Sequence, residues 1–276
     1  MNRSPQYADL HLHSNRSDGF CTPDQLVEKA LEHNLKAIAI VDHDDISALE
    51  EAIPFGKEKG IEVIPGVELS VQHNNLEFHL LGYCFDLGNP ELQAQLRLFK
   101  ENRVQRARKI VNKLSKLGVA ISFEEVIQRA GEGTVGRPHI AEVLLEQGCV
   151  FSFQDAFNRY LGSGKPAYEQ NFRMDFITAL RLVRGAGGIC SIAHPALVLD
   201  DEMIYQLIKA GIEGIETIHP KHNLEKTRYF SEIARRNGLV ETGGSDYHGG
   251  KKGEEALGHY RISMENVLRL KEISSC

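Results

Sequence analysis

Polar and apolar residues alternate near the start of the chain. Asp9, His11 and His13 alternate with Ala8, Leu10 and Leu12. Alternate side chains of a β-strand share one face, so this segment predicts a strand with an acid and two imidazoles on the same side. Apolar or alternating runs predict six further strands, at residues 37–41, 61–65, 77–83, 188–193, 214–218 and 239–243.

Segments with helical spacing lie between most of these strands. We expect a helix that begins after Thr22 and reaches about His33. Thr22 would be its N-cap, Pro23 suits the first helical position, and Gln25 completes a capping box. The same reasoning predicts helices at residues 46–59, 175–185, 203–210, 224–237 and 265–273.

This alternation stops between residues 91 and 168, which are mainly helical. Val104, Ala107, Val111 and Leu114 recur at helical spacing, and shorter amphipathic segments lie near residues 123–130, 140–147 and 153–161. We therefore expect a helical insertion domain at residues 91–170, between the fourth and fifth strands. The main domain would comprise residues 1–90 and 171–276.

Alternating strands and helices predict an α/β fold with a parallel sheet covered by helices. Residue types that bind metals occur in, or at the C-terminal ends of, all seven predicted strands. In a (β/α) barrel these ends converge on one face, whereas an open sheet draws its ligands from only a few strand ends. The sequence thus favours closure into a seven-stranded barrel.

The composition is that of an ordinary soluble globular protein, with 276 residues of which 42% are hydrophobic and 25% charged. There is no apolar run of about 18 residues, so we expect no transmembrane helix and no membrane partner. Residues 1–5 lack the apolar core of a signal peptide. A net charge of −6 argues against binding nucleic acid over the whole surface, but leaves room for a local basic groove.

The cysteines favour a cytoplasmic location. They are scattered and odd in number, without a C-x-x-C pair, which is typical of reduced thiols rather than disulfides or a thiolate zinc site. The five are Cys21, Cys84, Cys149, Cys190 and Cys276.

Six histidines and three carboxylates are candidate metal ligands: His11, His13, Asp18, His43, Glu68, His79, His194, Asp246 and His248. Singly, some could be structural, since His79 could be a hydrogen-bonded core histidine and Asp18 a turn residue. Together, such a cluster would be costly to bury without a partner. Imidazoles and carboxylates without thiolates suit Mn²⁺, Fe²⁺ or Zn²⁺. Nine ligands exceed the donors of one ion, so we expect two or three divalent ions, with manganese first and iron or zinc as alternatives.

Six segments resemble motifs of the polymerase and histidinol phosphatase (PHP) family of metal-dependent phosphoesterases. They are Asp-Leu-His-Leu-His-Ser14, Val-Asp-His-Asp44, Pro-Gly-Val-Glu68, His-Leu-Leu-Gly82, Ala-His-Pro195 and Gly-Ser-Asp-Tyr-His-Gly249. Within the insertion, residues 136–141 and 160–168 resemble the TrpH-like subgroup, which includes the exoribonuclease RNase AM and 3′,5′-bisphosphate nucleotidases.

This resemblance implies a distorted seven-stranded barrel with three metal sites. One site would comprise His11, His13, Glu68 and Asp246, and a second Glu68, His79 and His194, with Glu68 bridging the two. The third would comprise Asp18, His43 and His248. Asp18 stands where some relatives have an imidazole.

The predicted chemistry is hydrolysis by a hydroxide that bridges two cations. Cations sharing a carboxylate lower the pKa of a bridging water and neutralise the phosphate oxygens, so no serine or cysteine nucleophile is needed. The predicted catalytic residues are Glu68, Asp246, His194 and His219. Three further acids, Asp9, Asp42 and Asp44, are expected to orient imidazoles.

Four residues are candidates for phosphate binding. The guanidinium of Arg137 could make a bidentate contact. His219 could contact phosphate or protonate the leaving oxygen, or be structural. His139 could equally be a packed helix residue, and Lys165 could belong to a mobile glycine-rich loop.

The segment 97–116 holds eight basic residues against one acid, Glu101. Two interpretations stay open: the solvated face of an amphipathic helix, or a surface along the approach of an RNA backbone.

We expect a phosphoesterase acting on 3′,5′-bisphosphate nucleotides or on short 5′-phosphorylated RNA from its 5′ end, with no obligate protein partner. The alternatives are a small-metabolite phosphatase resembling histidinol phosphatase and a non-catalytic nucleic-acid-binding PHP module.

Overall fold

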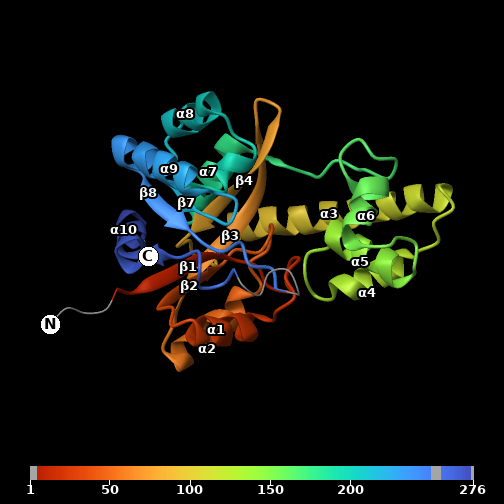
Figure 1. Cartoon of the computed structure of the whole chain (residues 1–276), viewed down its shortest axis with the longest axis horizontal. Helices are drawn as coiled ribbons and strands as arrows, with labels where there is room; N and C mark the ends of the chain where they lie inside the picture. The colour runs from red at the N-terminus through yellow and green to blue at the C-terminus, as the bar shows by residue number, and fades with distance from the viewer. Residues whose placement is uncertain (1–4, 250–255, 275–276) are drawn as a thin grey trace.

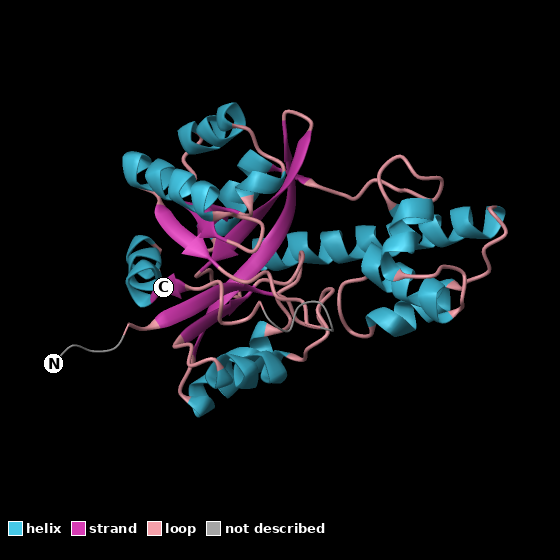
Figure 2. Cartoon of the chain, in the orientation of Figure 1, coloured by secondary structure: helices cyan, strands magenta, loops and turns pink. Residues whose placement is uncertain are grey.

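A computed structural model describes residues 5–249 and 256–274. Over these residues one sheet is surrounded by helices, and a second group of helices projects to one side (Figures 1 and 2). The strands are β1 (Tyr7–Leu12), β2 (Ala37–Ile40), β3 (Glu62–His73), β4 (Leu76–Tyr83), β5 (Met174–Asp175), β6 (Ile189–Ile192), β7 (Gly214–Ile218), β8 (Val240–Gly243) and β9 (Ile262–Ser263). The α/β class is confirmed.

The strand order is β8-β7-β6-β4-β3-β2-β1-β9, and β5 pairs with β3. The seven predicted strands correspond to β1–β4 and β6–β8. The two-residue strands β5 and β9 were missed because they are too short to show a pattern.

The expectation of a parallel sheet is wrong for β4, which is antiparallel to both of its neighbours, β3 and β6. The cause lies in the turn between β3 and β4. Asn74 and Asn75 both have positive φ, 48° and 64°, and asparagine tolerates this conformation in tight hairpin turns. Strand β3 therefore runs past the sheet and returns directly as β4, without a helix between them.

The sheet is nearly closed where the segment after β8 meets β1. Leu12 forms a parallel bridge with Tyr247, whose carbonyl accepts from the His13 amide at 2.9 Å. At Gly244 a Cβ atom would lie 2.5 Å from the His11 amide nitrogen, so this close approach requires glycine. The closing segment carries the candidate ligands Asp246 and His248.

The helices of the barrel follow the expected pattern. They are α1 (Pro23–Glu32), α2 (Leu49–Lys59), α7 (Phe176–Gly185), α8 (Asp201–Lys209), α9 (Leu224–Asn237) and α10 (Met264–Ile273). The capping box of Thr22 and Gln25 is present at the start of α1. Helix α2 begins three residues later than expected and ends at Gly60, which has a φ of 78°.

The projecting group contains α3 (Pro90–Lys116), α4 (Phe123–Ala130), α5 (Arg137–Glu146), α6 (Phe153–Ala156) and the π-helix η1 (Phe157–Leu161). At 27 residues, α3 is about 40 Å long and runs from the barrel into this group (Figure 1). Leu92, Leu96 and Phe99 of α3 pack in the main core, whereas Ile110 and Leu114 pack in a separate core of the projecting helices. These helices lie where the insertion was expected, and the domain boundaries at 90 and 170 stay a prediction.

None of the helices in the described residues offers an apolar stretch that could cross a membrane. Four of the five cysteines are described, and no disulfide joins them. Cys276 and residues 1–4 lie outside the described residues.

Candidate metal centre

All nine predicted ligands gather at one end of the sheet. Those after β1, β2, β6 and β8 meet there because the C-terminal ends of parallel strands converge. His11 lies inside β1, one residue before its end. Glu68 and His79 come from within β3 and β4, and reach the cluster because these strands continue past the ends of their neighbours β2 and β6. His11 and His13 are 0% exposed and Glu68 is 1% exposed.

The carboxylate of Glu68 lies at the centre of five imidazoles. Its Oε1 lies 2.8 Å from His79 Nδ1 and 3.0 Å from His194 Nε2. Its Oε2 faces three more nitrogens: those of His43 at 3.1 Å, His13 at 3.3 Å and His11 at 3.6 Å. Each oxygen of Glu68 thus faces its own group of imidazoles. A carboxylate that bridges two cations needs this arrangement.

Asp246 provides a second carboxylate for the β1 histidines. Its Oδ1 lies 3.4 Å from His11 Nε2 and 3.2 Å from His13 Nε2. Asp246 has a φ of 49°, in the left-handed region that is uncommon for residues other than glycine.

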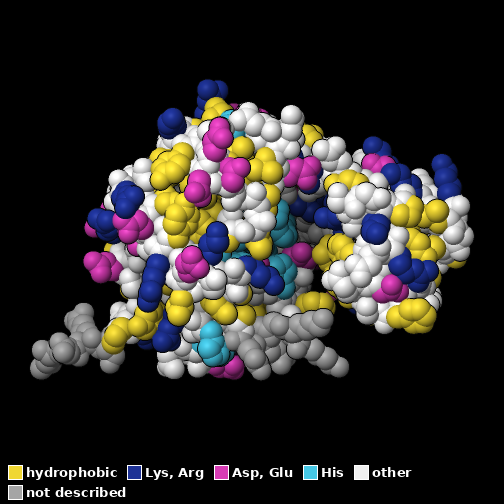
Figure 3. Space-filling model, turned by 45° about the horizontal axis from the view of Figure 1, so that its top comes forward, with side chains coloured by type: hydrophobic (Ala, Val, Ile, Leu, Met, Phe, Trp, Pro, Cys, Tyr) yellow, Lys and Arg dark blue, Asp and Glu magenta, His cyan; other side chains and the backbone are white. Residues whose placement is uncertain are grey.

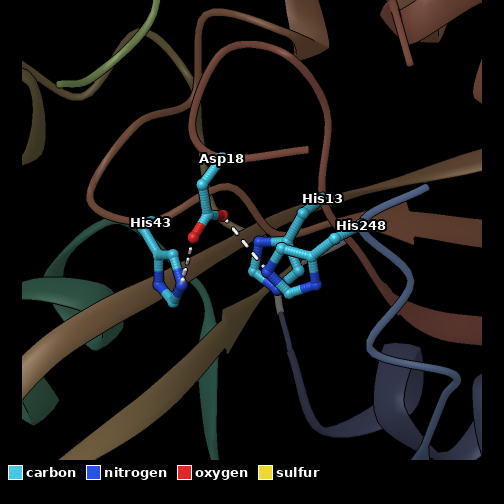
Figure 4. Close-up of side chains that lie close together, drawn as sticks. All are labelled: His13, Asp18, His43 and His248. Carbon is cyan, nitrogen blue, oxygen red and sulfur yellow. Dashed lines mark ion pairs between the residues drawn. The ribbon is translucent and has the colours of Figure 1, made fainter. Parts of the chain in front are cut away.

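Asp18 contacts His43 and one further histidine, His248, at the more exposed edge of the cluster. Its Oδ1 lies 3.2 Å from His248 Nε2 and its Oδ2 lies 3.8 Å from His43 Nε2. Figure 4 shows both contacts, with the His13 ring beside that of His248. The ring centroids of His13 and His248 are 4.1 Å apart.

Donor atoms fall into three sets whose members lie within 4.8 Å of one another: His13, Asp18, His43 and His248; His11, His13 and Asp246; and His43, Glu68 and His79. These sets overlap the predicted sites without matching them residue for residue, since His13 and His43 each belong to two. The assignment of ligands to individual ions therefore stays a prediction.

The cluster fits divalent cations because several of its buried donor atoms have no hydrogen-bond partner among the described residues. These atoms are His11 Nε2, both ring nitrogens of His13, His43 Nδ1, Glu68 Oε2 and His79 Nδ1. Buried polar atoms are normally paired, and cations accept imidazole and carboxylate donors of this kind.

Burial and neighbouring charges act in opposite directions on the ionisable groups of the cluster. Burial alone would raise the pKa of Glu68, but His79, His43 and His11 hold that pKa well below its usual range. Burial lowers the pKa of His43 to about 4, so its ring is neutral at pH 7, as a metal ligand must be. His248 is different, because Asp18 outweighs burial and raises the His248 pKa to about 10.

The three acids expected to orient imidazoles bind the segments that carry the histidines. In the described part of the chain, Asp42 binds Ser14 and Ser17, and Asp9 binds the amides of His11 and Ser245. Asp44 binds Ser70 and Arg103. None of these hydrogen bonds reaches an imidazole ring, so the orienting role of these acids stays a prediction. These acids fix the loops on which the histidines stand.

A carboxylate outside the nine predicted ligands that contacts an imidazole ring is Glu216, which was not predicted from the sequence. It is 0% exposed in β7, and its Oε1 lies 2.8 Å from His11 Nδ1. A lone acid inside a strand predicted to be buried was the available signal, because such a group needs a partner.

A cavity of about 180 Å³ opens beside the cluster, between the barrel and the projecting helices. Figure 3 shows histidine and basic side chains together in this hollow. Its lining includes Asp18, His43 and His79 from the cluster, and four arginines: Arg103, Arg106, Arg137 and Arg173.

Two of these arginines are paired with acids. Arg103 Nε donates to Asp44 Oδ2 at 2.9 Å, and Arg173 forms an ion pair with Glu77. Arg106 and Arg137 donate instead to backbone carbonyls, those of Glu169 at 2.9 Å and Leu161 at 3.1 Å.

The cavity therefore carries positive charge that its walls do not neutralise. Burial, together with Arg137 and Arg103, lowers the pKa of Arg106 to about 9. An anion in the cavity would stabilise the charged form of Arg106.

The other three residues predicted to bind phosphate are absent from the lining of the cavity. His139 accepts from the Gly136 amide at 3.0 Å and caps its own helix, and Lys165 is exposed; neither lines the cavity. The Nδ1 of His219 accepts from the Lys221 amide, which leaves a proton on Nε2, 3.3 Å from Asp246 Oδ2. The phosphate-binding roles of these three residues stay predictions.

Comparison with known proteins gives consistent relatives. The profile of the PHP domain matches residues 9–221. The 3′,5′-nucleoside bisphosphate phosphatase of Chromobacterium violaceum is 33% identical over 91% of this chain and 90% of its own. A 5′-3′ exoribonuclease of Haemophilus influenzae is 35% identical over 87% of this chain and 89% of its own. A solved Bifidobacterium adolescentis protein, provisionally described as a metal-dependent phosphoesterase, superposes with a TM-score of 0.89 at 29% identity, covering 98% of both chains.

Proposed function

The chain belongs to the PHP-domain family, and from this premise we propose that it is a metal-dependent hydrolase of nucleotide phosphoesters. The proposed substrates are 3′,5′-bisphosphate nucleotides and short 5′-phosphorylated RNA, degraded from the 5′ end. Relatives named as a bisphosphate phosphatase and a 5′-3′ exoribonuclease support this substrate class.

One observation carries the proposal: the arginine cavity and the imidazole–carboxylate cluster share a wall. Asp18, His43 and His79 belong to the cluster and also line the cavity. A phosphate held by Arg106 and Arg137 would bring the other end of the same nucleotide to the cluster. A terminal phosphate carries about 1.5–2 negative charges at neutral pH, which two unpaired guanidinium groups would balance.

This arrangement explains how one site could serve both substrates. The 5′-phosphate is bound by arginine while the ester on the 3′ oxygen lies at the cluster, whether that ester ends in a phosphate or continues as RNA. When bound, divalent cations would supply a nucleophilic hydroxide and neutralise charge on the phosphate oxygens. The residues that would hold them are the nine predicted ligands: His11, His13, Asp18, His43, Glu68, His79, His194, Asp246 and His248.

The proposed cofactors are two or three divalent ions, manganese first, with iron and zinc as alternatives. We place the reaction in the cytoplasm, because the four described cysteines form no disulfide and three of them are buried.

A substrate panel tests this proposal. Metal-depleted protein, supplemented with one metal at a time, is assayed on adenosine 3′,5′-bisphosphate, a 5′-phosphorylated oligoribonucleotide and histidinol phosphate. We expect turnover of the first two and little of the third. Absence of turnover on every phosphoester with each restored metal would refute the proposal.

The phosphatase resembling histidinol phosphatase is disfavoured by charge. Its substrate carries cationic groups, which the unneutralised guanidinium groups of Arg106 and Arg137 would repel. The non-catalytic module is disfavoured because all nine expected ligand positions hold residues capable of binding metal. If histidinol phosphate were the only substrate turned over, the phosphatase resembling histidinol phosphatase would be favoured instead.

A further inference from the structure

We propose that Glu216 is a positioning residue that holds a histidine from each of two predicted metal sites. The proposal rests on the metal-dependent function proposed above. Its basis is that the two oxygens of one buried carboxylate accept from two separate segments. Oε1 lies 2.8 Å from the Nδ1 of His11, and Oε2 accepts from the backbone amide of His194 at 2.6 Å.

At His11, the contact selects which ring nitrogen is free to bind a cation. A carboxylate beside Nδ1 keeps the ring proton on that atom, and the lone pair then lies on Nε2. The Nε2 atom faces Glu68 and Asp246, at 3.6 and 3.4 Å, and has no hydrogen-bond partner among the described residues. Glu216 thus presents His11 as a ligand in its binding-competent tautomer.

At His194, the contact holds an uncommon backbone conformation. His194 has φ 27° and ψ 57°, on the left-handed side of the map, which residues with a Cβ atom adopt rarely. The hydrogen bond to Glu216 Oε2 fixes the amide of this residue. In that conformation the His194 ring places Nε2 3.0 Å from Glu68 Oε1.

Glu216 acts through these histidines and not on a substrate, because it is 0% exposed and does not line the arginine cavity. A carboxylate is required here because both neighbours are donors. A glutamine of the same shape offers one acceptor oxygen and turns its NH₂ group toward the other donor. Glu216→Gln therefore disturbs one histidine at least, with little change in volume.

The test is the metal affinity of folded, metal-depleted protein, measured by competition with a chromogenic chelator for Mn²⁺ and for Zn²⁺. We expect Glu216→Gln to bind at least one ion about 10- to 100-fold more weakly than the unsubstituted protein. Glu241→Gln is the matched control. Glu241 lies in the neighbouring strand β8 and bonds to Ser231 Oγ at 2.6 Å, away from the histidines. Its substitution should leave both affinities unchanged.

Urea unfolding in the presence of chelator separates positioning from a purely structural role. If Glu216→Gln lowered stability while its folded form bound both metals within twofold of the unsubstituted protein, the proposal would be overturned. The readout does not involve a substrate. A protein that binds metal as expected but hydrolyses no phosphoester would refute the proposed function and leave this inference standing.

A measurement on the unsubstituted protein applies even if the variant does not fold. In ¹⁵N-histidine spectra of the metal-free protein, the His11 ring, assigned by its loss in His11→Asn, should carry its proton on Nδ1. A His11 ring protonated only on Nε2 would overturn the proposal.

Discussion

Replacing Arg103 with methionine should destabilise the protein by leaving Asp44 buried without its charge partner. Arg103 lies in the middle of α3, and Asp44 follows the candidate ligand His43. The Arg103 side chain is 9% exposed and that of Asp44 is 0% exposed. Their contact joins the projecting helices to the loop that carries His43.

The expected size follows from what remains around Asp44. Removing one partner of a buried ion pair costs about 3–5 kcal/mol. The Asp44 carboxylate would keep two hydrogen bonds, from the Ser70 amide at 2.7 Å and the Ser70 hydroxyl at 2.9 Å. Because these bonds still stabilise the charge, we expect the lower end of the range, about 3 kcal/mol.

Urea unfolding of the metal-free protein measures this loss, provided that fluorescence and circular dichroism give coincident transitions. The double variant Arg103→Met/Asp44→Asn should recover much of the stability, because the unpaired charge is gone. Lys109→Met, a change at an exposed position of the same helix, controls for the methionine itself. A loss below about 0.5 kcal/mol for Arg103→Met would show that water or another cation reaches Asp44, and the reasoning from burial would be refuted.

Three further results are expected. Chelation should lower the melting temperature, and Mn²⁺ at 100 times its Kd should restore about 2.7 kcal/mol of stability; calorimetry that shows no metal dependence would contradict the assigned cluster. Arg106→Met should reduce kcat/KM on adenosine 3′,5′-bisphosphate by about 10- to 150-fold, which corresponds to the loss of a charge-assisted hydrogen bond of about 1.5–3 kcal/mol. The same substitution should barely change turnover of a nucleoside 3′-phosphate that lacks the 5′-phosphate. Neutralising the exposed Arg97 and Lys109 should weaken turnover of oligoribonucleotides and flatten its salt dependence more than that of the bisphosphate; equal effects would mean that these residues are only solvated.

The sequence predicted elements well where one local rule decided the structure. The capping box at Thr22 and the periodicity of residues 224–237 correspond to α1 and α9. It failed at β4, where the direction of the strand depends on a two-residue turn rather than on the apolar pattern. Asn74 and Asn75 were the local signal, and a β-α-β expectation overrode it.

The candidate ligands could be predicted because imidazoles and carboxylates gathered at strand ends are costly to bury unless they bind a cation. What holds them in place could not. Asp9, Asp42 and Asp44 stand beside the histidines in the sequence and were expected to orient them. Glu216, about 200 residues from His11, is the acid that contacts the Nδ1 of the His11 ring. Proximity in the sequence says little here, because Glu216 lies in β7, which does not pair with β1 in the sheet.

The basic segment 97–116 shows why a charge count alone could not assign its role. Arg103 and Arg106 are each 8% exposed and line the cavity, whereas Arg97, Arg108 and Lys109 are exposed. Both interpretations of the segment treated the eight charges as one surface, but the helix is divided by its packing. Its first half is held in the core of the barrel and its second half in the core of the projecting helices. Arg103 and Arg106, which lie between the two cores, are therefore held at the junction beside the metal ligands. A mobile side chain on the surface would not be held in this position.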